Sequence, residues 1–426
     1  MEMMTFLISL FFFMIFSMPI AIVLALCAIS LMVVMNMWDP EILSQQMVMG
    51  MNNFPLMAVL FFMLSGEIMS KGTLAIRIIN FAKILVGRFR GGLGYAAVLA
   101  SMIFAGLSGS AVADAAALGS VLVPMMVQNG YRIERAVGLV CSAAILAPII
   151  PPSIPMIVLG VTVDISISRL FMSGIVPGIL LGFSLMATWW WVVRIDGYND
   201  VRKFSYEAII QTIKDAGPAL LLPLIIVGGI RFGIFTPTEA GSVAAVYAFG
   251  ISVFLYRELN FGQITEVCIA AAKMTAIVMF VVSAATAAGY MITMAQVPDQ
   301  IVSVFEPLIG SPFVLMLVIN IFLLILGMVM DLTPNILIFG PVLYPLIQKA
   351  GIDPFYFGLM MILNLCIGLL TPPVGTILYL GCSMGKIEFG QVVRGVWPFL
   401  AVEIAVLFLY IIFPQIVTTP LKWLMN

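Results

Sequence analysis

Two short polar stretches interrupt the apolar runs of this chain, and both offer oxygen atoms. The stretch "GLSGSAVAD" occupies positions 106–114, and the stretch "DLTPN" occupies positions 331–335. Carboxylate, hydroxyl and carbonyl oxygens are the ligands that hard cations prefer, and Gly109 permits a close approach to the backbone. The two stretches therefore predict sites for a hard monovalent cation such as Na⁺. Their candidate ligand side chains are Ser108, Ser110, Asp114, Asp331, Thr333 and Asn335.

Helix packing is the alternative explanation for these small residues. Runs such as "SGSAVADAAALGS" also let helices approach each other closely in a membrane. For any single serine, packing and ligation therefore stand as equal alternatives. Asp114 and Asp331 differ, because a carboxylate within an apolar hairpin is costly and is usually kept for function. We favour a functional role for the two aspartates over a structural hydrogen bond.

Two proline pairs, Pro151–Pro152 and Pro372–Pro373, fall inside apolar segments that could otherwise cross a membrane. A proline in a helix interior costs about 3 kcal/mol, because it removes a backbone donor and clashes with the preceding turn. The break exposes backbone amides, which suit a carboxylate, and carbonyl groups, which suit Na⁺. We predict that the two breaks and the two polar stretches together form one site for an ion and an anion.

The composition places these elements in lipid. Of the 426 residues, 63% are hydrophobic and 9% are charged, whereas soluble domains carry about 25% charged residues. The chain has no histidine and no GxxxxGK[ST] loop, which excludes imidazole-based catalysis and ATP hydrolysis by a P-loop. A net charge of −1 indicates no nucleic-acid partner, and five cysteines without CxxC spacing indicate packed thiols. The sequence predicts an all-α polytopic membrane protein that is not an enzyme.

The interruptions also define the elements that must position the polar residues. We expect residues 93–127 and 311–348 to form re-entrant helical hairpins, and residues 136–163 and 355–383 to form discontinuous helices. A shift of 221 positions superposes the two regions without a gap, and chance does not explain how many prolines and glycines then coincide. The aligned pairs are Gly106 with Gly327, Pro124 with Pro345, Gly130 with Gly351, Pro151 with Pro372, Pro152 with Pro373, Gly160 with Gly381, Gly174 with Gly395 and Pro177 with Pro398.

We divide the chain into one repeat at 1–193, a cytoplasmic loop with a linking helix at 194–231, and a second repeat at 232–426. Within the middle part, we expect residues 194–214 to form the longest polar loop and the linking helix to follow near 217–230. Basic residues gather in the short loops of one face, which makes that face cytoplasmic. The first hairpin then opens to the cytoplasm and the second to the outside, so the repeats are inverted. Inverted repeats with paired discontinuous helices are typical of secondary transporters. The basic residues of the cytoplasmic face are Arg88, Arg90, Arg132, Arg135, Arg194, Arg202, Lys203, Lys214, Arg257, Lys386 and Arg394.

Two other groups of residues have plainer interpretations. Thr236, Pro237 and Glu239 match a helix start, with an N-cap, a proline in the first turn and a glutamate that closes a capping box. We therefore favour capping over a binding role for Glu239. The run 189–191 contains three tryptophans just before Arg194, and we interpret it as an interfacial aromatic belt.

Five motifs in this order resemble the large membrane subunit of tripartite ATP-independent periplasmic (TRAP) transporters. They are "GLSGSAVADAAALG", "APIIPPSIP", "GIFTPTEAG", "GMVMDLTPN" and "GLLTPPVGT". The resemblance runs from near residue 1 to near residue 425, and within the family it is greatest to the 2,3-diketogulonate-type large permeases. It implies an elevator-type, Na⁺-coupled importer of organic acids that crosses the bacterial inner membrane many times.

The resemblance also implies partners and site residues. Such permeases work with a small membrane subunit of about four helices and a periplasmic substrate-binding protein, neither of which we expect to be fused to this chain. Family substrates include C4-dicarboxylates, sialic acid, sugar acids and keto acids, and no cofactor besides Na⁺ is implied. Carried over by motif, the Na⁺ sites lie near Ser108, Ser110, Asp331, Thr333, Thr371 and the break at Pro151.

Other membrane proteins are the competing classes. A channel would normally repeat a pore-lining motif around an axis, and an intramembrane protease would need histidine chemistry or paired aspartates on spanning helices. A stand-alone dicarboxylate/Na⁺ symporter of the same architecture is the nearer alternative, because it would share the inverted repeats and the hairpins. Genes for a secreted binding protein and a small four-helix protein beside this one would favour the TRAP interpretation.

Overall fold

The computed structural model of the chain describes residues 2–16, 18–198 and 205–425. In that part of the chain every regular element is a helix, so the predicted all-α class is confirmed. Seven of the described helices are long and apolar enough to cross a membrane. Several others are apolar but shorter than 18 residues, and some of these belong to the hairpins and broken helices that the sequence predicts.

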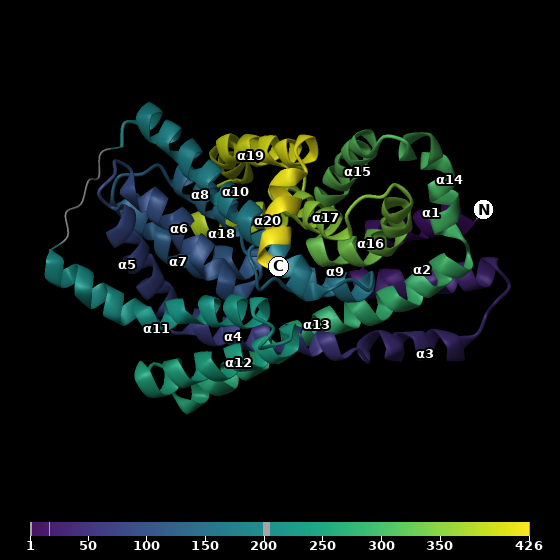
Figure 1. Ribbon diagram of the computed structural model, residues 1–426, viewed down its shortest axis with the longest axis horizontal. Helices are drawn as coiled ribbons and strands as arrows, with labels where there is room; N and C mark the ends of the chain where they lie inside the picture. The colour runs from purple at the N-terminus through teal and green to yellow at the C-terminus, as the bar shows by residue number, and fades with distance from the viewer. Residues whose placement is uncertain (1, 17, 199–204, 426) are drawn as a thin grey trace.

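A band of long helices runs along one edge of the molecule (Figure 1). Its longest member, α13, packs against α2, α3 and α4, and α12 packs against α4. Helix α13 starts at a capping box made by Asn260 and Gln263. The helices in and beside this band are α1 (Glu2–Ile15), α2 (Ile20–Val34), α3 (Pro40–Met51), η1 (Phe54–Leu56), α4 (Met57–Lys71), α5 (Leu74–Val86), α11 (Tyr206–Arg231), α12 (Pro237–Gly250), the π-helical turn η2 (Ile251–Leu255), α13 (Phe261–Met294) and α14 (Val297–Ile309).

The two interrupted regions form a second group of helices beside this band. Each region consists of a packed helix pair followed by a helix that breaks at its proline pair. The first region has α6 (Gly92–Ser108), α7 (Ala111–Gln128), α8 (Ile133–Ala144), α9 (Ile154–Thr162) and α10 (Ile167–Asp196). The second has α15 (Pro312–Gly327), α16 (Leu332–Lys349), α17 (Pro354–Gly368), α18 (Thr376–Gly385), α19 (Phe389–Ile412) and α20 (Gln415–Met425).

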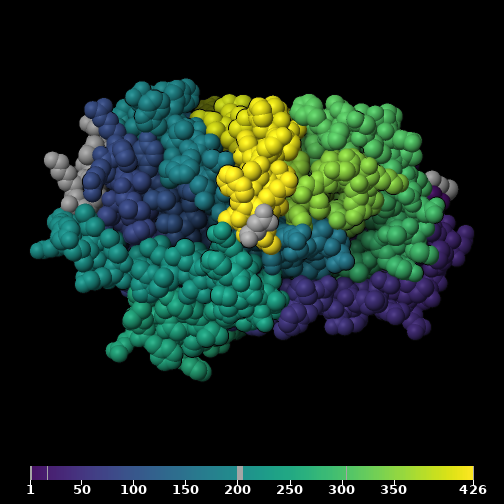
Figure 2. All heavy atoms as spheres, viewed as in Figure 1, coloured from purple at the N-terminus to yellow at the C-terminus, as the bar shows by residue number. Residues whose placement is uncertain are grey.

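The sequence repeat is also a repeat of helices. Helices α7 and α16 start 221 residues apart and end 221 residues apart, and α8 and α17 also start 221 residues apart. In Figure 2 the C-terminal helices, in yellow, lie between the first-region helices, in blue and teal, and the second-region helices, in green. The two regions thus meet within one helical body. Their inversion relative to a membrane and the domain boundaries at 193 and 232 stay predictions.

Two local expectations need correction. Residues 206–214, expected in a long polar loop, form the first turns of α11, because the Ser205 hydroxyl accepts a hydrogen bond from the amide of Ala208 and caps the helix. The basic residues Arg202 and Lys203 lie outside the described residues. Trp189 is fully buried and donates to the carbonyl of Gly91 at 2.8 Å, so it is a core residue and not part of an interfacial belt.

Candidate functional site

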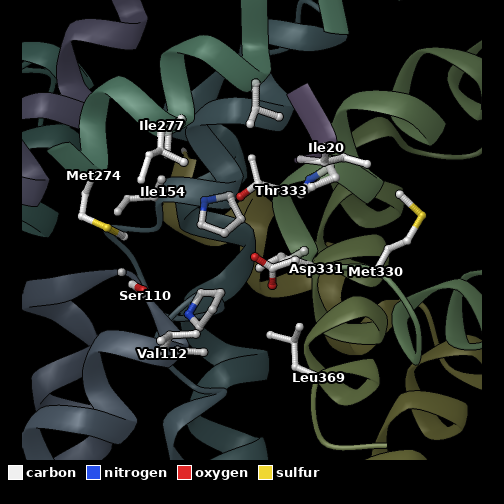
Figure 3. Close-up of a pocket in the computed structure, with 18 of the residues that line it drawn as sticks. Ile20, Ser110, Val112, Ile154, Met274, Ile277, Met330, Asp331, Thr333 and Leu369 are labelled. Carbon is white, nitrogen blue, oxygen red and sulfur yellow. The ribbon is translucent and has the colours of Figure 1, made fainter. Parts of the chain in front are cut away.

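A pocket of about 480 Å³ lies where the two polar stretches and the two broken helices converge (Figure 3). The stretch 106–114, hereafter the first tip, contributes Gly109 and Ser110 to its lining. The stretch 331–335, hereafter the second tip, contributes Asp331 and Thr333. Pro148 comes from the first break, and Leu369 comes from the second. Residues more than 200 positions apart in the chain therefore share one cavity, as the repeat predicts.

The first tip is held by hydrogen bonds within itself. Gly109 ends α6 with a left-handed φ of 62°, a conformation that favours glycine. Ser110 then caps α7, because its hydroxyl accepts from the amide of Ala113 at 3.4 Å. Behind the tip, the Ser108 hydroxyl donates to one oxygen of the fully buried Asp114, whose other oxygen has no partner among the described residues. Of the predicted ligands on this tip, Ser110 lines the pocket and Asp114 lies beneath it.

The first tip is fitted closely to the first break. A Cβ atom built on Gly109 would lie 2.7 Å from the carbonyl oxygen of Pro152. The hydroxyl of Ser153 donates to the carbonyl of Pro148 at 2.5 Å and accepts from the amide of Met156 at 3.3 Å, which caps α9. The tip and the break therefore form one packed unit, with the buried Pro151 and Pro152 outside the pocket lining.

The second tip presents a carboxylate to the pocket. Asp331 is the N-cap residue of α16, yet its side chain makes no capping hydrogen bond, and it is exposed and points into the cavity (Figure 3). Asn335, buried one turn later, donates its amide to the carbonyls of Met330 and Asp331, both at 3.1 Å. Its side-chain oxygen has no partner within the described part of the chain. Asp331 and Thr333 thus face the pocket, and Asn335 holds the loop from behind.

The second break contributes less to the pocket than the sequence predicts. The hydroxyl of Thr371 donates to the carbonyl of Ile367 at 2.8 Å, inside its own helical turn. Neither Thr371 nor the Pro372–Pro373 pair lines the pocket. Gly327 and Gly368 bring α15 and α17 into backbone contact beside this break, because a Cβ on Gly368 would lie 2.6 Å from the Gly327 backbone. The pocket therefore collects four of the predicted residues, Gly109, Ser110, Asp331 and Thr333.

One wall of the pocket was missed by the sequence reasoning. Part of this wall is one face of α13, whose residues at positions i, i+3, i+4 and i+7 line the cavity. Apolar residues nearer the start of the chain complete the wall. All of these side chains are apolar, so nothing distinguishes them from any other spanning helix in the sequence. They are Met274, Ile277, Val278 and Val281 of α13, with Met14, Met18, Ile20 and Met63 from α1, α2 and α4 and the segment between α1 and α2.

Glu239 has the structural role that the sequence favoured. Its carboxylate accepts from the amide of Thr236 at 2.8 Å, and the Thr236 hydroxyl accepts from the amide of Glu239 at 3.3 Å, which completes a capping box at the start of α12. The prediction of a cap is confirmed. Glu239 does not line the main pocket.

Comparison with known proteins identifies the family. The family model described as "Tripartite ATP-independent periplasmic transporter, DctM component" matches residues 7–416. The 2,3-diketo-L-gulonate TRAP transporter large permease protein YiaN of Escherichia coli is 48% identical over 95% of this chain and 96% of that protein. The sialic acid TRAP transporter large permease protein SiaM of Vibrio cholerae is 38% identical over 93% of each chain. The C4-dicarboxylate TRAP transporter large permease protein DctM of Pseudomonas aeruginosa is 39% identical over 87% of each chain.

The fold also resembles a solved structure. The crystal structure of the Alcanivorax borkumensis YdaH transporter covers 88% of each chain with a TM-score of 0.66 and 15% sequence identity, which supports the fold alone. The family match and the spanning helices make the chain a multi-pass protein of the inner membrane, and a transporter component, not an enzyme. This chain belongs to the DctM family, the large permease subunits of TRAP transporters.

Proposed function

We propose that this large permease subunit works in a Na⁺-coupled importer that receives an organic acid from a periplasmic binding protein. The relatives reported above are named for 2,3-diketo-L-gulonate, sialic acid and C4-dicarboxylates, all of which are organic acids. The relative named for 2,3-diketo-L-gulonate shares 48% of aligned residues, against 38% and 39% for the other two. We therefore propose a sugar acid or keto acid as the substrate.

The charge of the pocket is the observation that supports sodium coupling. Asp331 is exposed in the cavity, and the described lining includes no lysine or arginine. An organic acid in this pocket would meet a negative charge of its own sign, which is unfavourable at short range. A cation held beside Asp331 would offset that repulsion. Binding of the acid would then raise the affinity of the pocket for the cation, and binding of the cation would raise its affinity for the acid. This reciprocal coupling is the thermodynamic basis of symport.

The buried acceptors behind the two tips suit such a cation. Asp114 under the first tip and Asn335 under the second each have an oxygen without a partner in the described structure. A buried acceptor without a partner is costly. We propose that Na⁺ binds near each tip, with Ser108, Ser110 and Asp114 beside one site and Asp331, Thr333 and Asn335 beside the other. The half-helix ends at the two breaks would then complete the site electrostatically.

We also propose that the helices of the two regions move as one body against the α13 band, in the manner of an elevator. The support is the packing described above, in which each region has close backbone contacts of its own, while the face that α13 turns toward the pocket between the two tips is apolar. A small membrane subunit of about four helices is the expected partner of that band.

Reconstitution of the complex in lipid vesicles tests the function. Uptake of a labelled organic acid should require a sodium gradient, the small subunit and the binding protein together. Uptake by this chain alone, driven by sodium, would favour the stand-alone symporter. Uptake in sodium-free buffer with only a proton gradient would contradict sodium coupling. A panel of sugar acids, keto acids, sialic acid and C4-dicarboxylates identifies the substrate.

A further inference from the structure

A carboxylic acid lies inside the helical body, outside the pocket. Glu403 of α19 has no exposed surface, and neither of its carboxylate oxygens has a hydrogen-bond partner in the part of the chain that the structure describes. No ion pair between described residues includes it. Burying an acid in this way is costly unless something compensates for its charge.

Glycines bring α19 against the first broken helix. A Cβ atom on Gly138 of α8 would lie 2.3 Å from the carbonyl carbon of Gly395 of α19, so the two backbones touch. One turn beyond Gly138, the buried hydroxyl of Ser142 faces Glu403 and also lacks a hydrogen-bond partner among the described residues. Ser142 lies two residues before the end of α8.

The first half of the second broken helix, α17, also ends near Glu403. Cys366 lies two residues before the end of α17 and is close enough to Glu403 for the two groups to interact electrostatically. It is also within electrostatic reach of Asp331 on the second tip. Glu403 therefore lies between the last turns of α8 and α17, where the backbone carbonyls give each helix end a partial negative charge.

No cation from a neighbouring helix compensates for Glu403. Helix α19 packs against α8, α10, α15, α17, α18 and α20, and within the described chain Cys366 is the ionisable side chain within electrostatic reach of Glu403. Helix α15 has no ionisable residue, and Cys141 interacts electrostatically with Cys382. The other ionisable residues of these helices have other partners or lie toward helix ends: Glu134, Arg135, Arg169, Arg194, Asp196, Tyr356, Tyr379, Glu388, Arg394, Tyr410 and Lys422.

An ionised Glu403 would be a bare negative charge beside two partially negative helix ends, in an interior of low dielectric. A proton removes that charge and turns the carboxyl group into a hydrogen-bond donor. We propose that Glu403 is a proton-binding site, occupied while the two breaks are packed as they are in this structure. The Ser142 hydroxyl is the acceptor that faces this proton.

Infrared spectroscopy of the complete chain in lipid tests the proton directly. The C=O stretch of a protonated carboxyl group is separate from the bands of carboxylates and amides. Glu403→Gln should remove one protonated-carboxyl band at neutral pH. The matched control is Glu388→Gln at the exposed start of the same helix, which should leave that band unchanged. Identical protonated-carboxyl bands in the wild type and in Glu403→Gln would overturn the proposal.

Sodium titration distinguishes a proton from a sodium ion at this position. If Glu403 carries a proton, the neutral glutamine is an adequate substitute, and half-saturating sodium for uptake by the complex should stay within about twofold of wild type. A Na⁺ ion at Glu403 would depend on the negative charge. A sodium requirement raised about tenfold by Glu403→Gln would therefore overturn the proposal.

Alkaline stability provides a third measurement. A folded state that holds a proton which the unfolded chain releases loses stability as pH rises. The unfolding temperature of the wild type should therefore fall more between about pH 7 and about pH 9 than that of Glu403→Gln, and Glu388→Gln should follow the wild type. Equal slopes for wild type and Glu403→Gln would count against the proton.

Two further variants test the proposal if Glu403→Gln fails to insert into the membrane. Glu403→Met supplies a neutral side chain of similar length, and Glu403→Asp keeps the acid. Normal insertion of either neutral variant supports a protonated carboxyl group. If both neutral variants were lost while Glu403→Asp inserted and transported, the negative charge itself would be required, and the proton site would be ruled out.

Discussion

At the scale of single residues, the two tips use their polar side chains differently. Ser110 is engaged as a helix cap, and the Ser108 hydroxyl is engaged with Asp114. An N-cap aspartate normally accepts from the amides of the first turn, but the Asp331 side chain makes no such bond and faces the pocket. Asp331 is therefore the side chain whose charge would interact most directly with a bound cation.

Replacement of Asp331 by asparagine tests this assignment. Asp331→Asn keeps the size of the side chain and removes its charge. Loss of one charge-assisted contact costs about 1.5–3 kcal/mol, so half-saturating sodium should rise about tenfold or more, while insertion stays normal because no capping bond is lost. Sodium-dependent uptake in vesicles measures the change, and an unaltered sodium requirement with poor expression would make Asp331 a structural residue.

Glu239→Gln is the matched control for that experiment. The glutamine keeps a side-chain oxygen that can accept from the amide of Thr236, so the capping box at α12 is retained. Sodium dependence should remain at the wild-type value.

The sequence identified the polar residues of the site better than the apolar ones. A serine, a threonine or an aspartate in an apolar run stands out because lipid disfavours it, and three such predicted residues, Ser110, Asp331 and Thr333, line the pocket. Glu403 carries the same signal inside "WPFLAVEIAVLFLY" and was overlooked. Three consecutive tryptophans point about 100° apart around a helix, so one of them, Trp189, had to turn inward, which the pattern alone did not reveal.

At the scale of elements, each tip depends on the break beside it. Gly109 of the first tip lies against the carbonyl of Pro152, and Gly327, at the end of the helix that leads to the second tip, lies against Gly368. The bounds of these elements followed from the sequence, because prolines, glycines and caps mark where a helix must start or end. The close approach of α8 and α19 did not, since it depends on how two distant glycines, Gly138 and Gly395, meet in space.

Substitution of Gly109 by alanine should separate the first tip from its break. The new Cβ would lie 2.7 Å from the Pro152 oxygen in a left-handed conformation, so the tip must move, and uptake should fall at least about tenfold, the effect of about 1.4 kcal/mol. The control is Gly130→Ala, which has a φ of 85° and no atom within 4 Å of the new Cβ. It imposes comparable backbone strain, about 1 kcal/mol, without a clash, so its uptake should stay near wild type. Equal losses in the two variants would attribute the effect to strain.

At the scale of the whole molecule, an ion pair joins the two halves of the chain outside the spanning segments. Glu258, between η2 and α13, accepts from Arg77 at 2.7 Å and from the amide of Thr73 at 2.8 Å. The Arg77 guanidinium also lies 4.0 Å from the centre of the Tyr256 ring. Burial would raise the pKa of Glu258, but the hydrogen bonds from Arg77 and Thr73 outweigh it and hold that pKa below its usual value.

The pH dependence of this contact follows from the lowered pKa of Glu258. A carboxyl group whose folded-state pKa is depressed stabilises the fold above its unfolded pKa and loses that effect as pH falls through the folded value. Glu258→Gln should therefore cost about 1 kcal/mol at neutral pH. Its difference from wild type should shrink as pH falls and vanish once the pH is below the lowered pKa of Glu258. Unfolding by denaturant at both pH values measures this, and a constant difference would contradict the assignment.

The inverted arrangement of the repeats makes a prediction about the two sides of the membrane. Asn129, near the end of α7, and Lys349, at the end of α16, are near-counterparts in the repeat. In a background with the native cysteines replaced, an impermeant thiol reagent should label Asn129→Cys from the cytoplasm and Lys349→Cys from the periplasm. Labelling of both from one side would show that the repeats are parallel.

The apolar face that α13 turns toward the pocket has a consequence for discrimination between substrates. Its side chains at 274, 277, 278 and 281 are all apolar, so that side of the pocket has no side-chain donor or acceptor with which to compare hydroxyl groups. A site that hydrogen-bonds a hydroxyl group rejects analogues that lack it by about 10⁴-fold, whereas an apolar surface tolerates them. If the tips bind the acid group as proposed above, the α13 face would add no discrimination among the hydroxyl groups of different acids, and that part of the pocket would accept sugar acids and keto acids alike.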